Sequence, residues 1–186
     1  AGVDVVPVGS LHLTFDIARG LQTPLVEAER IKTLYGTLIS AQSDEHESFS
    51  YPLAGEEEGA TYQTTRARLT SIIKPRFAQI FALVRERLAE NPASAFAGET
   101  VVLTGGASQL LGAQDFASRE LSRQVRLGRP LVLPGMPSSV AGPHFATLCG
   151  LALAGTEAGA NLHRPQGDFE QQGYLGRVGS WLRSSF

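Results

Sequence analysis

The sequence predicts an α/β protein, because short β-rich segments alternate along it with segments of helical periodicity. Apolar residues make up 42% of its 186 residues, a share that favours a packed core over disorder. That length suits one ordinary domain, or two small subdomains that share a core. We therefore expect helices and strands to pack in layers.

Strand and helix signals alternate in the first third of the chain. The first helix should stop at Gly20, because glycine readily adopts the left-handed backbone conformation that often ends a helix. The second should begin with Thr23 as its N-cap and Pro24 in its first turn, and it should stop near Gly36. The expected elements are a strand at residues 3–8, helices at 11–20 and 23–36, and strands at 37–41 and 48–53.

A long amphipathic helix dominates the middle of the chain. Apolar residues recur at three- and four-residue spacing from about Thr64 to Glu90, and Pro75 predicts a kink or a break within that helix. Shorter elements are expected after it. They are a strand at residues 101–103, a helix at 115–121 with 124 as an alternative end, a strand at 130–133 and a helix at 144–154.

Composition and charge argue against several classes of function. The 16 basic and 18 acidic residues give no electrostatic reason to expect a nucleic-acid partner. The four histidines lack ligand spacing, so no metal site is predicted, and no residue is predicted to be catalytic. The single cysteine, Cys149, excludes an internal disulfide and is expected to be buried in a packed helix. Without a signal peptide or a spanning apolar stretch, a cytoplasmic protein is expected.

A double glycine follows the expected strand at residues 101–103. Gly105 and Gly106 carry no Cβ, so their backbone can approach a flat ligand closely. The carboxyl end of a strand in an α/β sheet is also where ligands bind. No Lys-Ser or Lys-Thr pair follows, which excludes a Walker-type phosphate loop. A tight turn without a ligand is the alternative interpretation.

Glu29 and Lys32 are three residues apart on the second expected helix and therefore share one of its faces. They are interpreted either as a surface ion pair or as a pair that contacts a ribose and an adenine. Helical spacing alone leaves both interpretations open.

The last residues combine an apolar helical face with basic side chains. A linker rich in glycine, glutamine and asparagine is expected at residues 159–173, followed by an amphipathic helix at 174–186. A short basic helix with a tryptophan is typical of an interfacial membrane anchor, and a helix docked on the protein's own core is the alternative. The candidate membrane-binding residues are Tyr174, Leu175, Arg177, Val178, Trp181, Leu182, Arg183 and Phe186.

Several of these segments together resemble the FtsA family of bacterial cell-division proteins. The resemblance covers nearly the whole chain, and its most specific parts are the first and the last. The similar segments are 16–36, the Pro-Arg-aromatic run at 73–77, the adenosine motif of the actin superfamily at 101–112, the helix at 142–151 and the membrane-targeting tail at 179–186.

The resemblance implies an actin-like fold, of which this chain would be the second large lobe. The larger subdomain would comprise residues 1–22 and 97–158, and residues 23–96 would form a smaller inserted subdomain. The insertion would receive the carboxy-terminal tail of FtsZ, the tubulin-like ring protein. Lys74 and Arg76 are candidates to pair with that acidic tail, with plain solvation of both as the alternative. The chain would then connect the FtsZ ring to the cytoplasmic face of the inner membrane at the division site and help to recruit other divisome proteins.

The same resemblance implies a nucleotide between the two lobes. Glu29, Lys32, Gly105, Gly106 and Ser108 are the candidate cofactor-binding residues, on the base-and-ribose side. The family's phosphate-binding segments would precede residue 1, since the chain opens within an apparent strand and is expected to be a fragment. ATP with Mg²⁺ is therefore expected for the full-length protein, and weak or no binding here, so enzymatic activity is left undecided. Phe15 stands where the family usually has a polar residue.

Other actin-fold proteins give the alternative interpretation of these motifs. A fragment of an Hsp70-like chaperone or of a sugar kinase would share the Glu29–Lys32 spacing or the fold, and a relative in rod-shape or pilus assembly is a third candidate. The apolar tail favours the division protein, because chaperones and kinases have no need of a lipid-binding terminal helix. Self-association into actin-like filaments also follows from the family resemblance.

Overall fold

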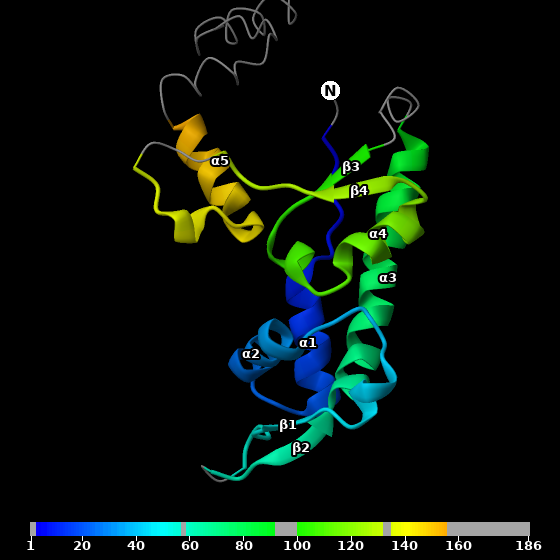
Figure 1. The fold of residues 1–186 in the computed structure, drawn as a ribbon, viewed down its shortest axis with the longest axis vertical. Coiled ribbons are helices and arrows are strands. Elements are labelled where there is room, and N and C mark those ends of the chain that lie inside the picture. Colours follow the sequence, from blue (N-terminus) through cyan, green and yellow to red (C-terminus); the bar gives the residue numbers. More distant parts are fainter. Residues whose placement is uncertain (1–2, 57–58, 92–99, 132–134, 156–186) are drawn as a thin grey trace, which may run out of the picture. The chain divides into compact units, whose positions relative to one another are not determined.

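The computed structural model describes residues 3–56, 59–91, 100–131 and 135–155. Contacts between residues divide the chain into one unit, Ala1–Cys149, and a second, Gly150–Phe186, of which the described residues 150–155 complete the last helix and the turn after it. The main elements are two helices, a pair of short strands, a long helix and then a strand-helix-strand-helix run (Figure 1). They are α1 (Ser10–Leu21), α2 (Leu25–Tyr35), β1 (Ser48–Tyr51), β2 (Tyr62–Thr65), α3 (Arg66–Glu90), β3 (Thr100–Leu103), α4 (Ala113–Leu121), β4 (Gln124–Leu127) and α5 (Ala146–Ala154).

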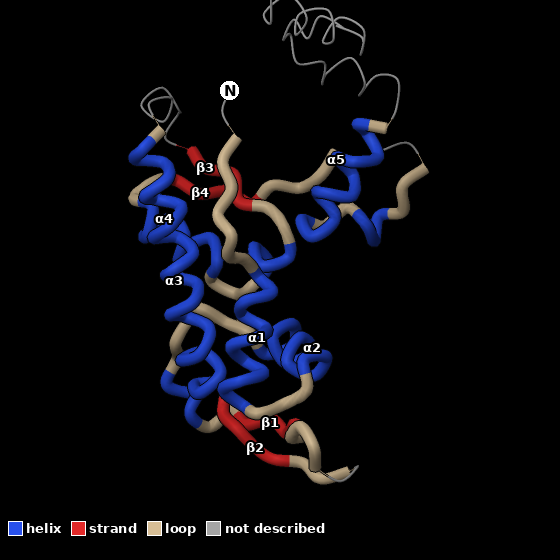
Figure 2. The backbone as a smooth tube through the Cα atoms, turned by 180° about the vertical axis from the view of Figure 1, so that it is seen from behind, coloured by secondary structure: helices blue, strands red, loops and turns tan. Residues whose placement is uncertain are grey.

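The core of the first unit is built around α1, which packs against both α2 and the long helix α3. Figure 2 shows α1 and α3 side by side, with β1 and β2 at one end of α3 and α4 at the other. Burial of these helices' apolar faces is the main stabilising contribution, at about 1.5–3 kcal/mol for each large side chain. The largest fully buried apolar side chains are Leu13, Ile17, Ile31, Leu38, Leu69 and Ile73.

Helix α1 extends beyond its expected end, because Gly20 lies within it. The left-handed residue that ends it is Gln22, at φ 52°. Gly20 has a packing role instead, since a Cβ there would lie 2.7 Å from Ile72 Cδ1 on α3. The missing side chain lets the two helices approach each other closely.

Residues 3–9 form no strand, which corrects the first expected element. Valine-rich segments are stabilised as strands by a partner strand and by neighbouring side chains. Val3 is 97% exposed and Val5 is 73% exposed, so neither side chain packs against such neighbours.

Helix α2 begins one residue later than expected. Its N-cap is Pro24, and the Thr23 hydroxyl instead donates to the carbonyl of Pro52 at 2.7 Å. The end is confirmed at Gly36, whose N–H donates to the carbonyl of Lys32 at 3.0 Å. This helix carries both Glu29 and Lys32.

The segment after α2 contains less strand than the sequence predicted. Residues 37–41 contribute only an isolated bridge between Thr37 and Leu111, because a 3₁₀ turn follows directly. The buried Asp44 carboxylate accepts from the Ala41 N–H at 2.8 Å and holds that turn. Strand β1 is confirmed, and it pairs antiparallel with β2, whose residues Thr64 and Thr65 were expected at the start of the long helix.

Helix α3 is one continuous element of 25 residues. The Thr65 hydroxyl caps it by accepting from the Arg68 N–H at 3.2 Å. Pro75 lies inside the helix without breaking it. The carbonyl that loses its donor belongs to Ser71, whose exposed position leaves it accessible to water.

A β-α-β unit follows α3. Strands β3 and β4 pair in parallel, with Thr100 opposite Gln124, and α4 connects them. The strand expected at 130–133 is wrong for Pro130 and Leu131, and 132–133 lie outside the described residues. The strand forms six residues earlier, as β4. It was missed because its polar and apolar residues alternate and so give no apolar run.

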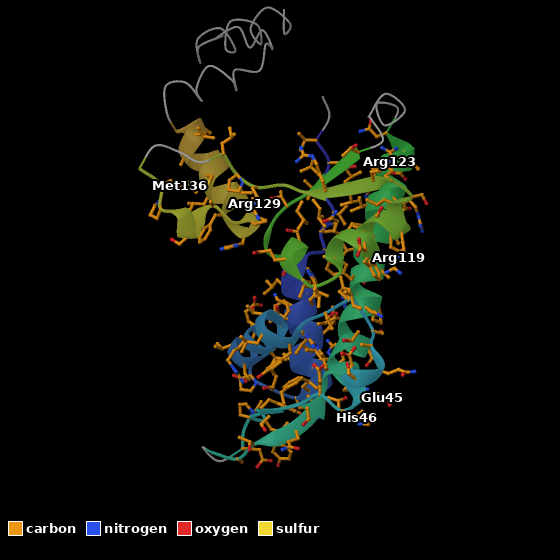
Figure 3. The ribbon with its side chains drawn as sticks, in the orientation of Figure 1. Glu45, His46, Arg119, Arg123, Arg129 and Met136 are labelled. Atoms are coloured by element: carbon orange, nitrogen blue, oxygen red, sulfur yellow. The ribbon has the colours of Figure 1, made fainter. Side chains whose placement is uncertain are left out.

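Helix α5 and the turn before it together match the helix predicted at residues 144–154 closely. A 3₁₀ turn at Pro143–Phe145 leads into α5, and Cys149 is buried as predicted, with its Sγ 3.8 Å from the Met136 Sδ. Figure 3 labels Met136 next to this helix. The expected linker at 159–173 and the expected tail helix at 174–186 lie outside the described residues. Within the described part of the chain, no helix is long and apolar enough to cross a membrane.

Candidate functional site

A buried ammonium group connects helices α1 and α2. Lys32 Nζ lies 2.6 Å from Glu29 Oε2 and donates to the hydroxyls of Thr14 at 2.9 Å and Ser10 at 3.0 Å. The Thr14 hydroxyl in turn donates to Glu29 Oε2 at 2.6 Å. The side chain of Lys32 is only 8% exposed, so the Glu29–Lys32 ion pair is present but its ammonium group lies below the surface.

Glu29 combines a fixed position with an accessible carboxylate. Its side chain is 53% exposed although Lys32 and Thr14 hold one of its oxygens. Partial burial raises the pKa of Glu29, but the hydrogen bonds from Lys32 and Thr14 outweigh it and leave that pKa below its usual value. Glu29 is therefore ionised at neutral pH and can accept hydrogen bonds from a ligand's hydroxyl groups.

The double glycine forms a tight turn at the end of β3. Gly105 adopts φ 94°, which a residue with a side chain rarely adopts, and its N–H donates to the Pro143 carbonyl at 3.1 Å. The Ser108 hydroxyl donates to the Gly105 carbonyl at 2.6 Å and is buried. Ser108 therefore supports the turn from within.

These two regions face each other across a cavity of about 580 Å³. Glu29, Lys32 and Gly106, three of the five predicted cofactor-binding residues, line it, whereas Gly105 and Ser108 shape the turn beside it. The other lining residues are Ser10, Thr33, Gly36, Ala107, Gln109, Leu110 and His144. Sequence analysis missed Gln109 and His144, because they are 35 residues apart and no local pattern connects them.

A second cavity, of about 650 Å³, lies between α3, α4 and the segment after α2. Lys74, which hydrogen-bonds the Ser40 hydroxyl, and Arg119 both line it. Figure 3 shows Arg119 on α4, on the side away from α2. The complete lining is Leu38, Ile39, Ser40, Lys74, Gly112, Asp115, Ser118 and Arg119.

Arg76 lies on a different side of α3 from Lys74, because two residues correspond to about 200° of helical rotation. Its Nε and Nη2 donate to the two oxygens of Asp16 on α1, at 2.5 and 2.9 Å. The hydrogen bond from Arg76 holds the pKa of Asp16 below its usual value. The alternative of a merely solvated Arg76 is therefore wrong, and a partner's carboxylate would have to displace Asp16 to reach it.

Metal binding gains no support from the part of the chain that the structure describes. There, no three residues among His, Cys, Asp and Glu group closely enough to hold an ion. The predicted membrane-binding residues at 174–186 lie outside the described ranges and stay a prediction.

Comparison with known proteins points to one family. The sequence profile described as "Cell division protein FtsA" matches residues 1–150. A protein of that name from Agrobacterium fabrum is 39% identical over 98% of this chain and 43% of its own length. Proteins of the same name from Neisseria meningitidis and Escherichia coli are 32% and 30% identical, over 98% of this chain and 45% of their own length. The chain thus spans less than half the length of these relatives.

The fold is also found among solved structures. MreB5 of Spiroplasma citri bound to ADP matches with a TM-score of 0.63 and 13% identity, over 86% of this chain and 48% of that protein. An MreB5 structure bound to AMPPNP matches with a TM-score of 0.60 and 14% identity, over 84% and 46%. At such low identity the likeness shows the fold alone, and it confirms the predicted actin-like α/β architecture.

Proposed function

Because this chain belongs to the FtsA family of cell division proteins, we propose that it is a division adaptor that connects the FtsZ ring to the membrane. A role in cell division follows from the family itself. Family membership also removes the alternatives of an Hsp70-like chaperone and a sugar kinase. The partners in this proposal are the FtsZ tail, membrane lipids, other divisome proteins and further copies of the chain in actin-like filaments.

A nucleotide site is part of the proposal. The observation that supports this site is a single cavity lined by two suitable groups. They are the ionised carboxylate of Glu29 and the backbone of Gly106, which carries no side chain. Ribose hydroxyls can donate to Glu29, while a flat base can lie against the glycine backbone. The two MreB5 structures hold ADP and AMPPNP, which supports an adenine nucleotide. Phosphates and Mg²⁺ would be bound largely by other parts of a full-length protein, so this cavity would hold the adenosine moiety.

The acidic tail of FtsZ is proposed to bind beside Lys74. Lys74 and Arg119 place two cations around a cavity that also exposes part of Ile39, and Asp115 is the one acid that lines it. An acidic peptide with an apolar side chain complements such a surface. Arg76 would contribute only after its guanidinium exchanges Asp16 for a carboxylate of the peptide.

Titration with a peptide of the FtsZ tail tests this surface. Lys74→Glu is expected to weaken binding about tenfold, because it replaces an attraction with a repulsion. Arg87→Glu makes the same charge change on α3 away from the cavity and should leave binding nearly unchanged. Asp16→Asn should strengthen binding severalfold if Arg76 takes part, because it frees the guanidinium. Equal affinities for Lys74→Glu and the unmodified chain would remove this cavity as the docking surface.

The membrane attachment rests on the sequence of residues 174–186. At helical pitch, Trp181 lies within the apolar arc and Ser180 lies opposite it. Trp181→Glu is expected to reduce sedimentation with liposomes of anionic lipid at least tenfold, because each large apolar side chain buried in the interface contributes about 1.5–3 kcal/mol. Ser180→Glu is the matched control, since it adds the same charge on the polar face and should reduce binding much less. Similar losses for both variants would argue against an oriented amphipathic helix.

A further inference from the structure

Two polar side chains from different turns meet at the wall of the cavity that Glu29 also lines. The amide Nε2 of Gln109 and the Nδ1 of His144 are 2.7 Å apart. Gln109 ends the 3₁₀ turn that follows Gly105, and His144 lies in the turn before α5. Both residues are exposed and both line the cavity, so each can reach a ligand there.

The backbone around this pair holds the two turns together. The Pro143 carbonyl accepts from the Gly105 N–H at 3.1 Å and from the Thr104 hydroxyl at 3.4 Å. Gly142 leaves room for the imidazole, because a Cβ at that position would lie 2.6 Å from Cε1 of His144 and 2.8 Å from its Nδ1. The position of the ring thus depends on a glycine next to it.

The contact with His144 pairs one orientation of the Gln109 amide with one tautomer of the ring. With the amide nitrogen facing it, Nδ1 of His144 is the acceptor in the tautomer that carries its proton on Nε2. Gln109 keeps its carbonyl oxygen and one N–H for a ligand. Rotating the amide by 180° would turn its oxygen toward Nδ1, and the bond would then require the ring proton to move from Nε2 to Nδ1.

We propose that Gln109 is the base-selective contact of the nucleotide cavity and that His144 is the residue that positions its amide. This inference rests on the proposed nucleotide site. If ribose hydroxyls donate to Glu29, the edge of the base meets the opposite wall. On that wall, Gln109 and His144 are the lining residues whose side chains carry nitrogen or oxygen.

A glutamine amide in this orientation selects a 6-aminopurine. Its oxygen accepts from the 6-amino group, and its remaining N–H donates to an adjacent ring nitrogen. A 6-oxopurine would place a second oxygen against the carbonyl of Gln109. Rotation of the amide relieves this repulsion only together with a change of tautomer at His144, so the arrangement with Nδ1 as the acceptor disfavours such a base.

The selectivity is tested by titrating the chain with adenosine, purine riboside and inosine, followed by NMR chemical shifts. Purine riboside lacks the 6-amino group, and inosine carries an oxygen in its place. Gln109→Ala is expected to weaken adenosine binding about 3- to 10-fold more than it weakens purine riboside binding, because purine riboside keeps the ring nitrogen and lacks only the 6-amino group. Gln63→Ala, an exposed glutamine on β2, is the control and should change neither affinity.

Substitutions of His144 separate its positioning role from a direct contact. His144→Asn keeps an acceptor near the place of Nδ1 and should retain the preference for adenosine over inosine. His144→Ala should lose most of that preference. Gly142→Ala should do the same with the histidine still present, because its Cβ displaces the ring.

The outcomes distinguish this inference from the proposed function. If the unmodified chain binds none of the three nucleosides, the nucleotide site and this inference are both overturned, whereas the division-adaptor proposal does not depend on that result. If it binds adenosine and Gln109→Ala weakens all three nucleosides equally, the nucleotide site stands and Gln109 is not its base-selective contact. If His144→Asn and His144→Ala lose the preference to the same extent, His144 does not act by orienting the amide.

Discussion

Replacing Ile31 with alanine is expected to lower the free energy of unfolding by about 2–5 kcal/mol, the range for deleting a buried aliphatic side chain. Ile31 is fully buried on the face of α2 that packs into the core, one residue from Lys32. The loss combines the transfer free energy of the missing methyl groups with the cavity that they leave. Urea denaturation followed by circular dichroism measures it.

Leu34 provides the matched comparison on the same helix. Its side chain is 58% exposed, so Leu34→Ala removes a similar volume but little buried contact and should cost less than about 1 kcal/mol. Equal losses for the two variants would contradict the assignment of the buried face of α2. Since α2 also carries Glu29, Ile31→Ala should weaken adenosine binding in proportion to the fraction of chain that it unfolds.

Gly36→Ala is expected to destabilise the chain by about 1–3 kcal/mol, as is typical when atoms are added to a packed site. The backbone of Gly36, at φ −63° and ψ 127°, suits alanine. The cost is steric, because the new Cβ would lie 2.3 Å from the Lys32 carbonyl oxygen and 2.7 Å from Leu110 Cδ2. The carbonyl is backbone and can yield only if the end of α2 moves. Thermal unfolding followed by circular dichroism measures the effect.

Gly20→Ala tests whether the backbone position of the Lys32 carbonyl causes the loss of stability expected for Gly36→Ala. Its Cβ would also be too close to another atom, at 2.7 Å, but that atom is the end of the Ile72 side chain, which can rotate. Alanine inside a helix also gains about 1 kcal/mol of helix propensity over glycine. Gly20→Ala should therefore stay within about 1 kcal/mol of the unmodified chain. A larger loss at Gly20 than at Gly36 would reverse this explanation.

Elements with a strong local signal could be predicted from the sequence. The spacing of apolar residues gave α3 to within two residues at its start, and the Thr-Pro pair and Gly36 bounded α2 to within two. Glu29 and Lys32 were placed on one face by helical spacing alone. Their connection to Thr14 and Ser10 could not be predicted, because it depends on how α1 and α2 pack.

The errors arose where a neighbour decides the structure. Residues 3–8 have the composition of a strand but pair with none among the described residues, whereas β4 forms on a weak local pattern because β3 lies beside it. Gly20 looked like a helix stop and proved to be a contact point with Ile72. Gln109 and His144 belong to turns that only the fold brings together.

Because α3 is one continuous helix, the angular positions of its early and late core residues around the helix axis depend on each other. Early in the helix, Leu69 and Ile73 belong to the core with α1, and about two turns later Phe77 and Phe81 place their rings 5.7 and 6.4 Å from that of Phe116 on α4. A helix advances by about 100° per residue. Deleting or inserting a single residue between these two sets would turn one of them away from its partner by that angle. Evolution can therefore exchange side chains along α3 far more freely than it can change the number of residues in that helix.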